Sequence, residues 1–333
     1  MLQESKKMLA AAAGLAFVLA AWAQNPPPQK DDQSVETFKV SVDVVNVFFN
    51  VKDDHGALIP GLQKDDFQIF EDGGPQTIKY FSAESNQPLT LGMLIDTSIS
   101  QQRVLPMEKE IGAAFLREVL REKDLAFVIS FDVDVGLLQD YTSNSRDLRA
   151  GLERAHINAG TSGIMFPGTG GNPVPNRRPR GTVLFDAVYL AADEMLSKEV
   201  GRKAVILLTD GADFGSRKDL RQAIEAAQRA DVICYVLLVE DRSWYASQGA
   251  FFPGEGDVKK LTAETGGRVI NVGSKPEKLK EAFDQIANEL RSQYNLGYTP
   301  TNPQRDGGFR KIEIKSHKGY KIQARRGYYA RTQ

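Results

Sequence analysis

Short segments rich in Val, Ile and Leu alternate with amphipathic segments of helical length through the middle of the chain. The apolar segments are residues 89–95, 125–131, 135–141, 204–209, 232–239 and 268–272, and the amphipathic ones are 103–121, 145–155, 183–197, 218–230, 258–265 and 277–292. Uniformly apolar strands between helices are typical of a parallel sheet that is covered on both faces. We therefore expect a doubly wound, mostly parallel α/β domain over residues 88–292, with 135–141 as an edge strand.

The segments on either side of this region alternate apolar and polar residues, as half-buried strands do. Residues 309–315 and 320–325 flank a turn at 316–319 and predict a hairpin. Residues 30–82 carry a net charge of −5 and residues 291–333 a net charge of +8. Because short strands bury too little surface alone, we expect 38–87 and 293–333 to combine into one β-sandwich-like subdomain. The alternative is that the basic C-terminal segment binds a membrane or nucleic acid.

The N-terminus has the pattern of an export signal. Lys6 and Lys7 precede an apolar run over 8–20, and Ala21-Trp22-Ala23 offers small residues at the cleavage positions. We expect a signal peptide over 1–23, a Pro-rich linker over 24–37 and a periplasmic or secreted mature protein without a membrane span. The apolar run at 8–20 is shorter than a membrane-spanning helix needs. The alternative is an uncleaved membrane anchor or a buried helix.

Composition excludes several function classes. The 333 residues carry 42 Lys and Arg against 43 Asp and Glu, which argues against a nucleic-acid partner. Cys234 is the one cysteine, so the chain has neither an internal disulfide framework nor a cysteine-rich zinc module. Cys234 lies in the apolar segment 232–239, where we expect it to be buried.

Oxygen-bearing side chains follow two of the predicted parallel strands. The strand at 89–95 is followed by Asp96, Ser98 and Ser100, and the strand at 204–209 is followed by Asp210. Thr182 opens the helix between them. Two carboxylates and three hydroxyls, without thiolate or imidazole, suit a hard cation such as Mg²⁺, with Mn²⁺ or Ca²⁺ as alternatives.

The pattern Asp96-x-Ser98-x-Ser100, followed by Thr182 and then Asp210-Gly211, resembles the von Willebrand factor type A (VWA) domain and its metal-ion-dependent adhesion site. The chain as a whole resembles secreted bacterial VWFA-related proteins. The resemblance implies that Asp96, Ser98, Ser100 and Thr182 surround the metal, whereas Asp210 acts through a water. It also implies a protein-binding role in adhesion or assembly, in which an Asp or Glu of a partner protein or matrix ligand completes the coordination of the metal.

Other interpretations of these residues stay open. Ser98 and Ser100 are also good helix caps, and Asp210-Gly211 is also an ordinary turn. Asp132 and Asp134 suggest a metal-dependent hydrolase or phosphotransferase, although a turn between two strands explains them too. A structural envelope protein with an incidental metal is a third possibility. We expect no enzyme, because no general base lies beside the ligand segments.

A Gly- and Pro-rich loop over 156–181 leads into Thr182 and ends in three arginines, Arg177, Arg178 and Arg180. Long loops without secondary structure are often functional in compact domains. We expect this loop to lie over the metal face, where its arginines would attract an acidic partner.

Overall fold

The computed structural model describes residues 44–83, 87–157, 181–241 and 255–332, which belong to one compact unit, Asp43–Gln333. The predicted signal peptide, the linker and the three arginines lie outside the described residues. Among the helices of the described ranges, none is long and apolar enough to cross a membrane.

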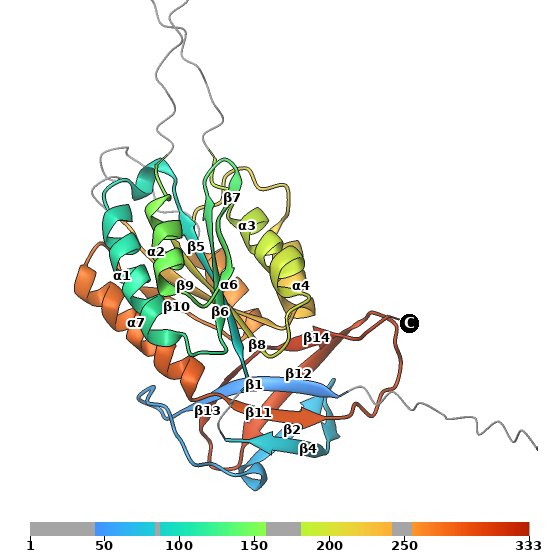
Figure 1. Cartoon of the computed structure of the whole chain (residues 1–333). Coiled ribbons are helices and arrows are strands. Elements are labelled where there is room, and N and C mark those ends of the chain that lie inside the picture. Colours follow the sequence, from blue (N-terminus) through green and yellow to red (C-terminus); the bar gives the residue numbers. More distant parts are fainter. Residues whose placement is uncertain (1–43, 84–86, 158–180, 242–254, 333) are drawn as a thin grey trace, which may run out of the picture. The chain divides into compact units, whose positions relative to one another are not determined.

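A six-stranded sheet forms the centre of the α/β part (Figure 1). Its order is β10-β9-β8-β5-β6-β7, with β5 (Leu89–Asp96), β6 (Leu125–Phe131), β7 (Val135–Thr142), β8 (Arg202–Thr209), β9 (Val232–Leu238) and β10 (Val269–Asn271). All neighbouring strands are parallel except β7, which pairs antiparallel with β6 at the edge of the sheet. The doubly wound, mostly parallel sheet predicted from the sequence is confirmed, as is the edge strand.

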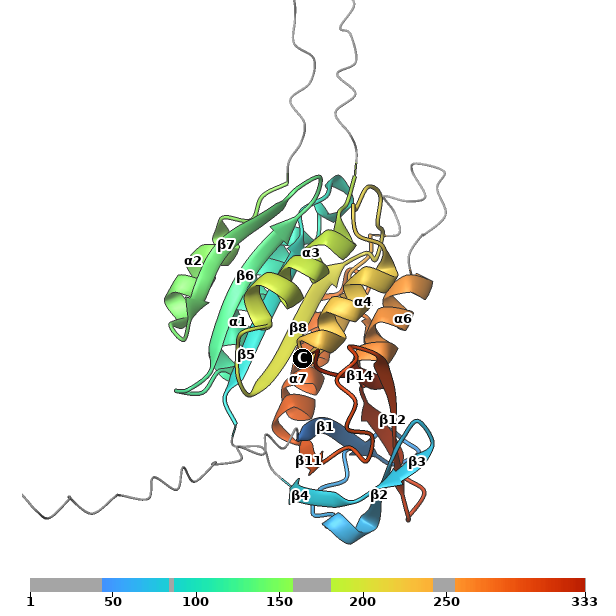
Figure 2. The same cartoon turned by 90° about the vertical axis from the view of Figure 1, so that its right-hand side faces the viewer.

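Helices cover both faces of this sheet (Figures 1 and 2). One face carries α1 (Leu105–Val119), α2 (Ser145–Glu153) and α7 (Pro276–Arg291); the other carries α3 (Leu184–Leu190), its π-helical continuation η3 (Ala191–Leu196), α4 (Leu220–Arg229) and α6 (Glu255–Thr265). Local sequence sets several helix starts: Asn144 caps α2, Asp219 forms a capping box with Gln222, and a proline opens α7.

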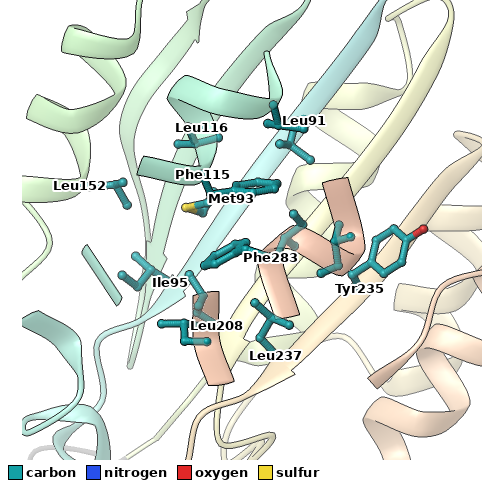
Figure 3. Packing of buried hydrophobic residues seen from close by; sticks show 14 of the residues in the cluster. Leu91, Met93, Ile95, Phe115, Leu116, Leu152, Leu208, Tyr235, Leu237 and Phe283 are labelled. Carbon is teal, nitrogen blue, oxygen red and sulfur yellow. The ribbon is translucent and has the colours of Figure 1, made fainter. Parts of the chain in front are cut away.

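Two apolar layers, one on each face of the sheet, stabilise this part. Figure 3 shows the first layer, in which Met93 of β5 lies among side chains of α1 and α7. The rings of Phe115 and Phe283 stack there with their centroids 4.4 Å apart. Cys234 is fully buried in the second layer, as predicted, and burial raises the pKa of its thiol to about 12.

Two four-stranded antiparallel sheets combine strands from both flanks. The first has the order β13-β1-β11-β4 and the second β14-β12-β2-β3. The strands are β1 (Val45–Lys52), β2 (Phe67–Glu71), β3 (Gly74–Gln76), β4 (Ile78–Ser82), β11 (Tyr294–Tyr298), β12 (Phe309–Ser316), β13 (Lys321–Ala324) and β14 (Gly327–Tyr329). Phe49, Phe67 and Tyr294 contribute to one shared apolar core, so the β-sandwich-like subdomain built from both flanks is confirmed.

The prediction of a C-terminal hairpin is wrong. The turn forms, with the Gly319 amide donating to the Ser316 carbonyl, but β12 pairs with β2 and β14 whereas β13 pairs with β1. Ile312 and Ile314 of β12 face the same core as Ile322 of β13. The two strands therefore pack across the sandwich, because burying both apolar faces removes more surface from water than pairing their edges.

Charged contacts connect the flanks with each other and with the α/β part. Lys318 pairs with Asp66 at 2.9 Å, in keeping with the opposite charges of the two flanks. The buried Glu289 of α7 accepts hydrogen bonds from Lys52 Nζ at 2.8 Å and from Arg268 Nε at 2.7 Å. Glu289 thus connects strand β1 with helix α7.

Candidate metal site

The first candidate ligand, Asp96, is the last residue of β5 and is fully buried. Its Oδ1 accepts a hydrogen bond from the Ser98 amide at 2.9 Å, and its Oδ2 accepts one from Thr209 Oγ1 at 2.7 Å. Thr209 ends β8, the parallel neighbour of β5, so the two strand ends lie side by side. This edge of a parallel sheet is where open α/β folds bind ligands.

A chain of hydrogen bonds joins three further candidates. Ser98 Oγ lies 3.0 Å from Ser100 Oγ, and Ser100 Oγ donates to Asp210 Oδ2 at 2.6 Å. Asp210 Oδ1 accepts a hydrogen bond from the Ala212 amide at 3.1 Å. The residue between them, Gly211, has a φ of +83°, a left-handed conformation that glycine adopts without strain. The structure therefore brings Asp96, Ser98, Ser100 and Asp210 together.

Thr182, the fifth candidate, is held between two neighbouring loops by the backbone. Its carbonyl accepts from the Phe214 amide at 2.9 Å, in the loop that follows Asp210. The next amide, of Val183, donates to the Asp132 carbonyl at 2.7 Å. At Gly181 a Cβ would lie 2.4 Å from the Phe214 carbonyl oxygen, so glycine permits this close approach. Thr182 is buried beside the Asp210 loop, and its position comes from these backbone contacts.

The electrostatics of the site favour a cation. Burial, followed by the nearby charge of Asp210, raises the pKa of Asp96 to about 7. Burial is the larger cause of this rise, and repulsion between the two carboxylates is the second; a divalent ion would relieve that repulsion. The described residues contain no group of three or more His, Cys, Asp or Glu suited to a metal, so a cation here needs the hydroxyls as ligands as well. The donor set of carboxylates and hydroxyls fits a hard ion such as Mg²⁺.

Sequence reasoning missed Thr209 at this edge of the sheet and a buried acid, Glu108, on helix α1. Thr209 holds Asp96, and its Oγ1 also accepts from the Gly211 amide at 3.0 Å. Glu108 of α1 is fully buried, and burial together with Asp96 and Asp210 raises the pKa of its carboxyl well above the usual range. The signal for Glu108 was an acidic residue on the apolar stripe of a helix, three residues after Leu105 and seven before Phe115.

Asp132 and Asp134, the candidates for a hydrolase, lie in the turn between β6 and β7. Asp132 Oδ1 accepts from the Asp134 amide at 3.1 Å, and Asp132 Oδ2 accepts from Thr97 Oγ1 at 3.3 Å. The Asp132 amide also donates to the Asp134 carbonyl at 3.1 Å. The turn predicted for this segment is confirmed: Asp132 Oδ1 stabilises it from within, and Asp132 Oδ2 connects it to Thr97, which directly follows β5.

Comparison with known proteins gives likenesses in structure only. No protein-family model and no curated protein matches the chain. BatB from Bacteroides thetaiotaomicron is 19% identical, with a TM-score of 0.45 over 61% of this chain and 97% of that protein. A von Willebrand factor type A protein from Catenulispora acidiphila is 13% identical, with a TM-score of 0.44 over 88% of this chain and 74% of that one.

A third similar structure is proximal thread matrix protein 1 from the mussel byssus, described with a zinc-occupied MIDAS motif. It is 15% identical, with a TM-score of 0.47, over 65% of this chain and 48% of that protein. At these identities and TM-scores the likenesses carry no conclusion about activity or partners. The central part of this chain is a doubly wound, mostly parallel α/β domain with an antiparallel edge strand, which is the fold class predicted from the sequence.

Proposed function

We propose that the chain is an exported, divalent-metal-dependent protein-binding module that acts in adhesion or assembly, in the periplasm or outside the cell. The observation that carries this proposal is the hydrogen-bonded group Asp96, Ser98, Ser100 and Asp210 at the ligand-binding edge of the sheet. In this proposal Thr182, whose carbonyl accepts from the Phe214 amide in the loop after Asp210, is the fifth ligand. Mg²⁺ is the preferred ion, and Mn²⁺ or Ca²⁺ are alternatives with the same kind of ligands.

The residues have distinct tasks in this proposal. Asp96 and Asp210 supply two negative charges, and Thr209 and the Ser98 amide hold the Asp96 carboxylate in place. The serine and threonine hydroxyls contribute neutral oxygens. A divalent ion held in this way supplies an electrophilic centre that accepts a carboxylate from another molecule, because its own ligands add no third charge. The expected partner is therefore a protein or matrix ligand that presents an Asp or Glu.

Capture from envelope extracts of the source organism tests this function. The mature wild-type chain, Asp96→Ala and the control Asp193→Ala are immobilised in Mg²⁺ and then washed with chelator. Asp193 is an exposed acid of η3, away from the ligand loops. We expect wild type and Asp193→Ala to release the same bound protein in chelator, and Asp96→Ala to capture none of it.

The result that contradicts the proposal is capture that neither chelator nor Asp96→Ala changes. That result would instead favour a structural envelope protein in which the metal is incidental. An Asp-rich competitor peptide adds a second criterion, since free carboxylates should displace a partner that binds through its own carboxylate.

A further inference from the structure

Three exposed apolar side chains lie at the edge of the sheet that carries the candidate metal site. They are Ile99, Val133 and Phe214, which expose 40%, 40% and 56% of their surface. Ile99 lies between the candidate ligands Ser98 and Ser100, Val133 lies in the turn after β6, and Phe214 lies in the loop after β8. Because β6, β5 and β8 are parallel neighbours, these segments leave the sheet at the same edge. We call the three side chains the apolar rim.

Hydrogen bonds connect the segments that carry the apolar rim. The Thr97 hydroxyl, in the segment after β5, donates to Asp132 Oδ2 in the turn after β6 at 3.3 Å. The Asp132 carbonyl accepts from the Val183 amide at 2.7 Å, and the carbonyl of the preceding residue, Thr182, accepts from the Phe214 amide at 2.9 Å. The rim residues therefore belong to one connected group of loops, which also holds the candidate ligands.

Local structure does not explain why these positions are apolar. Val133 lies in a turn between Asp132 and Asp134, where glycine and short polar residues are the usual choice. Phe214 precedes Gly215, whose φ of +126° marks a sharp bend, and it stays exposed there. Single exposed apolar residues are common on protein surfaces, but several on connected loops around one candidate ligand site indicate a contact surface.

The chemistry of the apolar rim restricts the partner. Apolar side chains cannot bond to hydroxyl or phosphate groups, so they stabilise a complex only where apolar surface of the partner covers them. In the proposed function the metal accepts a carboxylate of the partner. A ligand that fits both features has a carboxylate with large apolar groups beside it, which a polypeptide can offer and a polyuronate cannot.

We propose that the apolar rim binds large apolar side chains next to the acidic residue of the partner. The partner is accordingly a polypeptide segment in which Asp or Glu adjoins Leu, Ile, Val, Phe or Met. This inference rests on the proposed function, because the metal site must bind the carboxylate. The cation supplies the charge complementarity, and the rim selects among acidic ligands.

A phage library of short peptides with a fixed central Asp and random flanking positions tests the inference. The library is incubated with the immobilised mature chain in Mg²⁺, and the bound phages are eluted with chelator. We expect the positions beside the Asp of the eluted peptides to be enriched in large apolar residues relative to the unselected library.

The variant that removes the rim is Ile99→Ser/Val133→Ser/Phe214→Ser, which keeps every candidate ligand. We expect it to take up Mg²⁺ like wild type and to lose the apolar enrichment. Val200→Ser is the matched control, since Val200 is 79% exposed and lies just before β8, at the opposite end of the strand from Asp210. It should select the same peptides as wild type. If the triple variant takes up no Mg²⁺, the three single substitutions replace it.

A synthetic peptide of the enriched sequence gives the affinity by calorimetric titration in Mg²⁺. Phe214→Ser should weaken its binding about tenfold, because the ring no longer buries apolar surface, whereas Val200→Ser should leave it unchanged. Polygalacturonate, which carries carboxylates without apolar neighbours, should bind wild type more weakly than the peptide.

The outcomes separate this inference from the proposed function. Eluted peptides without apolar neighbours, equal selection by the triple variant, or polygalacturonate that binds as tightly as the peptide would overturn the inference alone. Sedimentation that shows Mg²⁺-dependent self-association, lost in the triple variant, would assign the rim to a second copy of the chain instead. Wild type that takes up no Mg²⁺, or that releases no phage in chelator, would overturn the proposed function and the inference with it.

Discussion

The buried carboxylate of Asp96 should make the metal-free protein less stable as the pH rises. Its pKa is 3.8 in an unfolded chain and about 7 in the folded protein, chiefly because of burial and secondly because of Asp210. The folded state therefore binds the proton more tightly, and the free energy of unfolding falls between about pH 4 and pH 7. A difference of one pKa unit between the folded and unfolded states is worth about 1.4 kcal/mol. The rise in the pKa of Asp96 from 3.8 to about 7 therefore lowers the free energy of unfolding by about 4 kcal/mol over this pH range.

Urea denaturation in chelator, at several pH values, measures this effect in wild type and in Asp96→Asn. The asparagine keeps the shape of the side chain but has no proton to lose, so the difference between the two proteins isolates Asp96. We expect the free energy of unfolding of wild type, relative to that of Asp96→Asn, to fall by about 4 kcal/mol from pH 4 to pH 8. Saturating Mg²⁺ at pH 8 should restore wild type and leave Asp96→Asn unchanged. A difference that stays constant with pH would refute the assignment of a buried, repelled carboxylate.

Three substitutions test other parts of the structure. Ser100→Ala removes the hydroxyl that donates to Asp210 and should weaken Mg²⁺ binding at least about tenfold in a calorimetric titration; unchanged affinity would remove Ser100 from the site. Gly181→Ala places a Cβ against the Phe214 carbonyl and should cost about 1–3 kcal/mol in urea denaturation, whereas a neutral effect would show that the loops separate easily. Glu289→Gln leaves two cations without their buried partner and should cost about 3–5 kcal/mol, and a loss below about 1 kcal/mol would contradict its role between β1 and α7.

Much of the α/β part could be predicted because its signals are local. The strand predicted at 125–131 has the bounds of β6, since an apolar run between turn residues marks it clearly. Asp96 and Asp210 could be predicted to lie together because parallel neighbours end at the same edge of a sheet.

The remaining features depend on contacts between distant residues. The sequence showed a turn between β12 and β13 but not that these strands enter different sheets, because the partners of β12 are β2 and β14. The second task of Thr209, which holds Asp96 from 113 residues away, has no sequence pattern of its own. Glu108 shows in the sequence as an acid on an apolar stripe, but only the fold shows that its side chain is fully buried.

The central claim is that the chain binds one divalent cation through Asp96 and Asp210, and titration with Mn²⁺ tests it most directly. Paramagnetic resonance of the free ion counts the Mn²⁺ taken up by the metal-free mature chain, with the double variant Asp96→Ala/Asp210→Ala as the comparison. The account predicts that wild type takes up one equivalent, which Mg²⁺ displaces, and that the double variant takes up none. An undiminished signal of free Mn²⁺ with wild type, or equal uptake by the double variant, would contradict it.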